Sequence, residues 1–173
     1  EYFMRQPDKL LEDIKIYSKQ TFWQKFSSFF SSIEFEKTDL ADHGGVRQEV
    51  KDSIDIISKI PYLDDRASAF ESFIRKNGLS VDELIIILKR IPYNDTKAEA
   101  ATYMVERYIE SLTTDELILI VKKIPYNDAR SSNIRYFAKV KKRSLDANDF
   151  SKLIAAAPYL EDKSYLGRLI IGD

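Results

Sequence analysis

The sequence contains the pentapeptide Ile91-Pro92-Tyr93-Asn94-Asp95 and repeats it without change at residues 124–128. Two looser copies, IPYLD and APYLE, occupy residues 60–64 and 157–161. The prolines of these four copies are 31, 33 and 33 residues apart. A fixed period of this length is typical of proteins built from stacked structural repeats. We therefore expect the same local structure around each copy of the pentapeptide.

Each unit carries the signals of two helices joined by the Pro-Tyr turn. Ser80 and Thr113 are each followed three residues later by glutamate, which predicts a capping box at the start of the first helix. Asp146 lies at the same place in the last unit and predicts an N-cap without a reciprocal glutamate. Proline ends this first helix, because the residue before a proline is disfavoured in the α region.

The second helix of each unit follows the turn. We expect the acid that closes each pentapeptide to cap this helix. We expect the basic residue two positions later to form an ion pair with the neighbouring unit. The acids are Asp64, Asp95, Asp128 and Glu161, and the bases are Arg66, Lys97, Arg130 and Lys163.

Two apolar runs, residues 84–88 and 117–121, also fit buried strands, since short apolar runs do not separate strand from helix by periodicity. The corresponding segment of the last unit, residues 150–157, is rich in alanine and poor in residues that favour strands. In the first unit, apolar residues within 50–60 step by three and four, as in a helix. Equivalent units should share a conformation, so we predict helices throughout. The apolar runs further predict that these helices are covered on most sides.

These signals divide the chain into an N-terminal segment, residues 1–45, and four helical hairpins, residues 46–78, 79–111, 112–144 and 145–173. The predicted fold is all-α: a short right-handed α-solenoid of about four helical hairpin repeats with an N-terminal capping helix.

The N-terminal segment has its own helical pattern. Apolar and aromatic residues form one stripe over residues 8–33, and a polar loop follows over residues 34–45. Because a terminal repeat must bury its outward side, we expect this amphipathic helix to cap the array. A helix that lies on a membrane surface is the alternative, since such helices combine aromatic and basic residues.

The turn has the form aromatic-x-Asp-x-Lys/Arg, as in Tyr93-Asn94-Asp95-Thr96-Lys97 and in residues 126–130. The tandem hairpins resemble HEAT-like and other α-solenoids. The turn itself is similar to that of a family of bacterial hairpin repeats with no assigned activity. The resemblance covers residues 46–173, and it implies a fold rather than an activity.

Composition excludes several classes of protein. The absence of cysteine excludes disulfides and thiolate sites, and it leaves the compartment open. The longest apolar runs have five residues, far fewer than a transmembrane helix needs. We expect a soluble protein, either cytoplasmic or secreted or periplasmic after processing. Because the sequence begins with Glu1 rather than Met, we expect a fragment or a processed product.

The sequence offers little for catalysis. His43 is the only histidine, and no nucleophile motif accompanies it. Metal-binding motifs and glycine-rich phosphate loops are also missing from the sequence. We therefore predict a protein that is not an enzyme, with no catalytic residues, no metal site and no cofactor.

The third unit is unusually basic. Residues 122–143 contain eight basic residues and one acid, in a chain of net charge −1. Such an excess is typical of a surface that binds an acidic protein, nucleic acid or lipid headgroups. A solvated helix end is the alternative, since cations stabilise helix C-termini. The candidate binding residues of this cluster are Lys122, Lys123, Arg135, Lys139, Lys141, Lys142 and Arg143.

The recurring tyrosines complete the candidate set. Tyr93 and Tyr126 would contact a ligand if the tyrosines line one edge. Alternatively, each tyrosine packs between neighbouring units, and its hydroxyl forms a hydrogen bond there.

We predict a non-enzymatic scaffold that binds a protein or peptide. The alternative function is a peripheral membrane or anionic-ligand binder that uses the basic third unit and the aromatic N-terminal helix. A dedicated nucleic-acid-binding domain usually has a strongly basic balance, so nucleic acid is not the expected partner.

Overall fold

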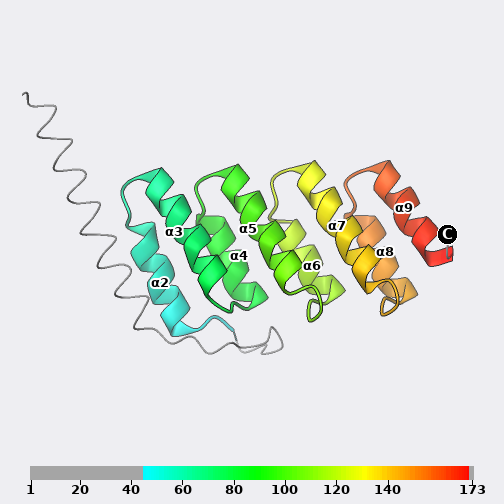
Figure 1. Cartoon of the computed structure of the whole chain (residues 1–173), viewed down its shortest axis with the longest axis horizontal. Coiled ribbons are helices and arrows are strands. Elements are labelled where there is room, and N and C mark those ends of the chain that lie inside the picture. The colour runs from blue at the N-terminus through cyan, green and yellow to red at the C-terminus, as the bar shows by residue number, and fades with distance from the viewer. Residues whose placement is uncertain (1–44, 172–173) are drawn as a thin grey trace, which may run out of the picture. The chain divides into compact units, whose positions relative to one another are not determined.

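The computed structural model describes residues 45–171, and in this range it contains eight α-helices and no strands (Figure 1). The helices are α2 (Gln48–Ser58), α3 (Leu63–Lys76), α4 (Val81–Arg90), α5 (Asn94–Arg107), α6 (Thr114–Val121), α7 (Asn127–Lys141), α8 (Ala147–Ala156) and α9 (Leu160–Ile171). The all-α prediction is confirmed for this range, and both apolar runs are helical. The helix expected over residues 8–33 lies outside the described residues.

The helices pack in two layers. Helices α2, α4, α6 and α8 contact one another in succession, and α3, α5, α7 and α9 do the same (Figure 1). Each helix of the first layer also contacts the helix that follows it in the chain. The Pro-Tyr turns consequently follow one another along one edge, and the connections from α3 to α4, α5 to α6 and α7 to α8 follow the opposite edge (Figure 1). None of the described helices has the length and hydropathy needed to cross a membrane.

Capping boxes begin α4, α6 and α8. In α4 and α6 the side chains of Ser80 and Thr113 accept a hydrogen bond from the backbone N–H of the third helical residue. That residue is a glutamate, and its side chain accepts a hydrogen bond from the backbone N–H of the N-cap residue. In α8, the Asp149 carboxylate accepts from the Asp146 backbone N–H at 3.2 Å. The N-cap predicted at Asp146 is therefore confirmed, and Asp149 completes the capping box in place of the missing glutamate.

The roles expected for the acid and base around the turn were also wrong. The N-caps of α3, α5 and α7 are the tyrosines of the pentapeptides, without a side-chain cap, and the acids lie in the first helical turn. In that position the acids still interact favourably with the positive end of the helix dipole. Arg66 and Arg130 reach back across the turn and donate to the carbonyls of Ile60 and Ile124. These carbonyls precede proline, so the arginines satisfy acceptors at the end of the first helix.

The core lies between the two layers. Phe70 and Phe137 from the second layer and Leu84 and Ile87 from the first are fully buried. Leu119, however, is 44% exposed, which contradicts the expectation that the apolar runs are covered on most sides. The reason is geometric. A first-layer helix packs against other first-layer helices on its flanks and against the second layer on its inner side, so its outward side contacts solvent.

Candidate functional site

Tyrosines connect neighbouring hairpins along the edge of the Pro-Tyr turns. The hydroxyl of Tyr93 donates to Asp64 at 2.7 Å, and the hydroxyl of Tyr126 donates to Asp95 at 2.7 Å. Tyr159 repeats the contact one hairpin later, with Asp128 as the acceptor. These three turn aspartates therefore each accept a hydrogen bond from the tyrosine hydroxyl of the next hairpin. The two candidate tyrosines have structural hydroxyls, but their residues remain 39% and 44% exposed.

The carboxylate acceptor raises the pKa of each of these tyrosines. For Tyr126 the hydrogen bond to Asp95 is the main cause, since ionisation would break the bond and place two negative charges side by side. A raised pKa means that the hydroxyl contributes stability at neutral pH and that this contribution is lost as pH rises through the folded-state pKa.

We expect Asp95→Asn to lower the Tyr126 pKa toward its ordinary value, because the neutral amide is a weaker acceptor and does not repel the phenolate. NMR titration of labelled tyrosine rings measures this pKa. Asp115→Asn is the matched control, because Asp115 pairs with Lys152 and not with a tyrosine. An unchanged Tyr126 pKa in Asp95→Asn would contradict the assignment.

An arginine–tyrosine cluster lies at the opposite edge. The Arg75 guanidinium carbon is 4.6 Å from the centroid of the Tyr103 ring, and that of Arg107 is 5.8 Å from it. Arg107 also donates to the Tyr103 hydroxyl at 2.7 Å and to the Arg75 carbonyl at 2.8 Å. The cluster joins α3 to α5 and holds its side chains in defined positions. The sequence did not indicate this cluster, because Arg75 lies 28 residues before Tyr103 and 32 residues before Arg107.

The basic cluster predicted from the sequence is divided by the structure. Lys122 and Lys123 lie between α6 and the Pro-Tyr turn, whereas Lys142 and Arg143 follow the far end of α7. Helix α7 has 15 residues and so separates the two groups by about 22 Å. Lys141 donates to the Glu110 carbonyl of the preceding hairpin at 2.8 Å. The basic run is therefore presented at the two ends of α7 and not at one place.

Arg135 is a structural residue. It forms an ion pair with Asp162 of α9, whose side chain is 0% exposed, and its guanidinium lies 5.2 Å from the Tyr165 ring centroid. Ser131 also donates to Asp162, at 2.6 Å. Burial would raise the pKa of Asp162, but the bonds from Ser131 and Arg135 outweigh burial and lower it. This candidate thus joins α7 to α9.

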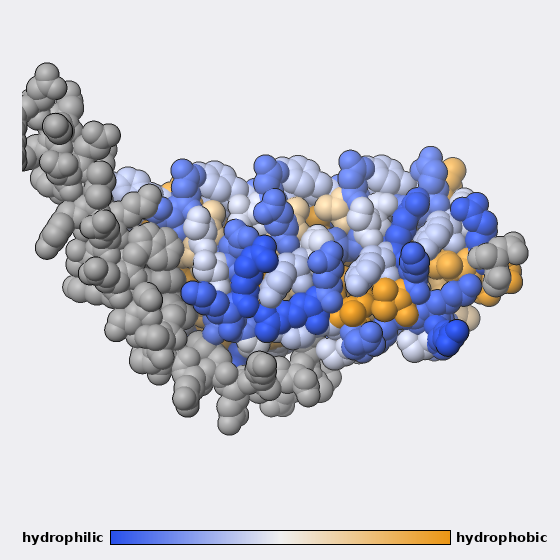
Figure 2. Space-filling view, in the orientation of Figure 1, coloured by the Kyte–Doolittle hydropathy of each residue, from blue (hydrophilic) through white to orange (hydrophobic). Residues whose placement is uncertain are grey.

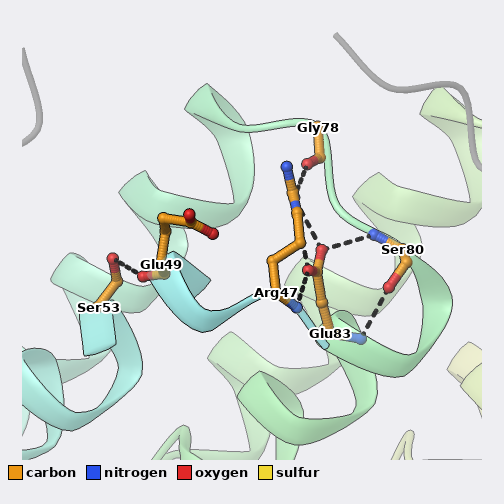
Figure 3. A network of polar contacts seen from close by, with 6 residues as sticks. All are labelled: Arg47, Glu49, Ser53, Gly78, Ser80 and Glu83. Atoms are coloured by element: carbon orange, nitrogen blue, oxygen red, sulfur yellow. Dashed lines mark hydrogen bonds and ion pairs between the residues drawn. The ribbon is translucent and has the colours of Figure 1, made fainter. Parts of the chain in front are cut away.

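A second buried carboxylate, that of Glu83, joins the first two hairpins (Figure 3). Each of its two oxygens accepts a hydrogen bond from the Arg47 guanidinium at 2.8 Å. One oxygen also accepts from the Arg47 backbone N–H, and the other accepts from the Ser80 backbone N–H. Arg47 and Ser80 are the N-caps of α2 and α4, so one carboxylate serves two helix starts. Burial would raise the pKa of Glu83, but these hydrogen bonds lower it.

The two buried carboxylates predict acid sensitivity. Because the pKa values of Glu83 and Asp162 are lowered by folding, their contribution is present above the unfolded-state values and is lost as pH falls through the folded-state values. We expect the urea midpoint to be steady between about pH 7 and 5 and to fall below about pH 4. Urea unfolding at a series of pH values, followed by circular dichroism, measures this. A midpoint that rises in acid would contradict it.

The outward side of the second layer presents exposed rings and apolar side chains. Tyr136 and Val140 of α7 are 40% and 42% exposed, and Ile170 of α9 is 49% exposed. Figure 2 shows this side of the protein: hydrophilic surface is concentrated over α3 and α5, and apolar surface lies toward α7 and α9. We call this surface, on the outward side of α3, α5 and α7, the outer face.

Within residues 45–171, no group of three or more histidines, cysteines or acids is placed to hold a metal ion. His43 lies outside the described residues. Comparisons of the chain with protein-family models, with curated proteins and with solved structures found no match.

Proposed function

We propose that this protein is a non-enzymatic scaffold that binds a protein or peptide partner on its outer face. The observation that carries the proposal is the Arg75–Tyr103–Arg107 cluster on α3 and α5, together with the exposed Tyr136 on α7, the next helix of the same layer. Arginine and tyrosine are enriched at protein interfaces and among the residues that contribute most to binding.

The proposal includes the finer description of the fold, a short α-solenoid of four helical-hairpin repeats. Its support is the recurrence of equivalent contacts between successive hairpins. Tyr126 reaches Asp95 and Tyr159 reaches Asp128, each across 31 residues. Lys141 reaches the Glu110 carbonyl at the opposite edge, again across 31 residues. The right-handed stacking and the unit boundaries expected from the sequence stay predictions.

These contacts favour binding for a physical reason. Side chains that must be ordered on association cost free energy, and side chains already held in place cost less. The Tyr103 side chain contacts two guanidinium groups, and Arg107 is held by two hydrogen bonds that it donates. A partner that contacts this cluster therefore meets an ordered surface.

Photocrosslinking tests the proposal. A photoreactive phenylalanine analogue replaces Tyr136 of the outer face in one sample and Leu119 of the first layer in another. The two positions are 40% and 44% exposed, so they differ in layer rather than in accessibility. We expect one defined protein adduct at residue 136 only, and we expect Tyr103→Ala to reduce it. Equal adducts at both positions, or none at 136, would overturn the proposal.

A further inference from the structure

We propose that α9 carries a second binding surface, which takes a helical hairpin of another polypeptide whose turn has the pattern Pro-Tyr-x-x-Asp. The surface consists of Glu161, Ser164, Arg168 and Ile171, and we call it the α9 face. It is separate from the outer face, which lies on α3, α5 and α7, so the inference does not depend on the proposed function.

The joint between α7 and α9 shows what such a surface binds. Asp128 of α7 accepts a hydrogen bond from the Tyr159 hydroxyl at 2.8 Å. Ser131 and Arg135 of α7 both donate to Asp162, whose side chain is 0% exposed. Three side chains of α7 thus hold the tyrosine of the next turn and the aspartate that follows it three residues later.

Helix α9 repeats this series of side chains. The acid, serine and arginine of α7 recur 33 residues later, in the same spacing, as Glu161, Ser164 and Arg168. Residues three and four positions apart are neighbours on the surface of a helix, so the three side chains share one side of α9. Helix α9 therefore presents the groups with which α7 binds the next hairpin.

The earlier helices of the second layer lack the series. Ala67 of α3 and Ala98 of α5 lie at the place of the serine. The tyrosines of the hairpins that follow them, Tyr93 and Tyr126, have no aspartate three residues later. The serine–arginine pair and the aspartate that it binds consequently occur together, and the pair on α9 indicates a partner with that aspartate.

The α9 face is exposed. Within residues 45–171, no hydrogen bond or ion pair joins the side chains of Glu161, Ser164 and Arg168 to another residue, and all three residues are exposed. Ile171 is 74% exposed, although its equivalents in the earlier hairpins are buried: Ile74, Val105 and Ala138. Among the described residues, no atom lies within 4 Å of the place that a Cβ of Gly167 would occupy. This side of α9 thus has both the room and the apolar surface for a packed neighbour.

The partner's chemistry follows from the match with α7. Its turn tyrosine would donate to Glu161, and its aspartate would accept from Ser164 and Arg168. A hydrogen bond between an arginine and a carboxylate is among the stronger ones, because both groups are charged. An apolar side chain of the partner would cover Ile171 and remove it from water. The partner helix would run beside α9 as α9 runs beside α7 (Figure 1).

The test uses the full chain and a fluorescent peptide with the sequence of residues 145–171, which contains the tyrosine and the aspartate of the α7–α9 joint. The peptide carries Arg168→Glu, so that it does not accept a second peptide. Fluorescence anisotropy measures its affinity for the chain. Ordering the peptide costs free energy on binding, but this cost is the same for each chain variant.

Two variants of the chain change the α9 face, Arg168→Glu and Ile171→Asp. Both side chains are exposed, so neither variant removes a core residue. Arg90→Glu is the matched control. Arg90 is also an exposed arginine in the last turn of its helix, and its replacement changes the net charge equally.

We expect Arg168→Glu in the chain to weaken binding about tenfold, as a loss of about 1.4 kcal/mol would. Ile171→Asp should also weaken binding, and Arg90→Glu should leave it unchanged. A peptide with Asp162→Asn should bind the unchanged chain more weakly. Its further loss with the Arg168→Glu chain should be smaller than that of the unchanged peptide, because the two groups act through one contact.

Failure to bind the peptide, or equal affinities for the Arg168→Glu and Arg90→Glu chains, would overturn the inference. A peptide that displaced the chain's own last hairpin from α7 would give this second result. Sedimentation of the full chain alone adds a further test. Self-association that Arg168→Glu abolishes would identify a second copy as the partner, since Tyr62 and Asp65 have the same spacing, and would overturn the choice of another polypeptide. If the peptide does not bind while residue 136 still crosslinks a partner, the proposed function stands.

Discussion

Replacing Glu83 with alanine is expected to lower the free energy of unfolding by about 3–5 kcal/mol, the usual cost of removing one partner from a buried ion pair. The carboxylate is 1% exposed and receives both the Arg47 guanidinium and two backbone N–H groups (Figure 3). Its removal leaves the 30%-exposed Arg47 side chain without this counter-ion. It also leaves the N-cap donors of α2 and α4 without their carboxylate acceptor, and unsatisfied donors add to the cost.

Glu116→Ala is the matched control. Glu116 occupies the same third helical position in α6 and completes the same kind of capping box. The hydrogen bonds that its carboxylate accepts, however, both come from Thr113. Loss of a cap alone costs about 1 kcal/mol. Chemical unfolding followed by circular dichroism compares the two variants. Equal losses would show that Glu83 acts only as a cap, and that its contacts to Arg47 contribute nothing to stability.

Ile87→Ala is the second large effect, with an expected loss of about 2–5 kcal/mol. Ile87 lies in α4 and is 0% exposed, so truncation removes buried methyl groups and leaves a cavity between the layers. Ile86 is its neighbour on the same helix and is only half-buried. The two substitutions share the same chemistry and the same helix propensity change, so their difference isolates burial.

For Ile86→Ala we expect about 1 kcal/mol, because only part of the side chain leaves water on folding. Urea unfolding of both variants measures the difference. Losses that match would show that both sides of α4 are enclosed, as the apolar run alone predicted. A small loss for Ile87→Ala would show that the layers are not packed at this position.

Signals that act over a few residues were readable in the sequence. Pro92 and Pro125 correctly placed the ends of α4 and α6, because proline restricts the residue before it. Ser80 and Thr113 correctly placed the starts of these helices, because a capping box joins residues only three positions apart. The repeat then carried the helical interpretation from the first and last units to the ambiguous apolar runs of the two middle units.

The partners of charged groups were less predictable. Asp95 was expected to cap its own helix, but it accepts from Tyr126 of the next hairpin. Arg130 was expected to pair with a neighbouring unit, but it donates to Ile124 of its own turn. By residue type and by position in the sequence, both Asp95 and Arg130 are compatible with the expected role and with the observed one. Only the distance between side chains in the folded protein selects one of them.

The candidate site shows the same division. Lys122 and Lys142 are close in sequence and belong to one basic run, yet a whole helix separates them in space. Arg75 and Arg107 are far apart in sequence and carry no shared motif, yet they contact the same ring. The sequence therefore identified an excess of basic residues but not the surface on which they lie.

The amino-acid sequence by itself determined the all-α class, the period and the turns of this protein, because caps, prolines and helical periodicity are interactions among near neighbours in the chain. Only the tertiary structure decided which carboxylates are buried, which tyrosines connect hairpins and where arginines gather. Those features depend on contacts between side chains 27–37 residues apart, such as Arg135 with Asp162 and Lys152 with Asp115. Such contacts exist only once neighbouring helices have packed.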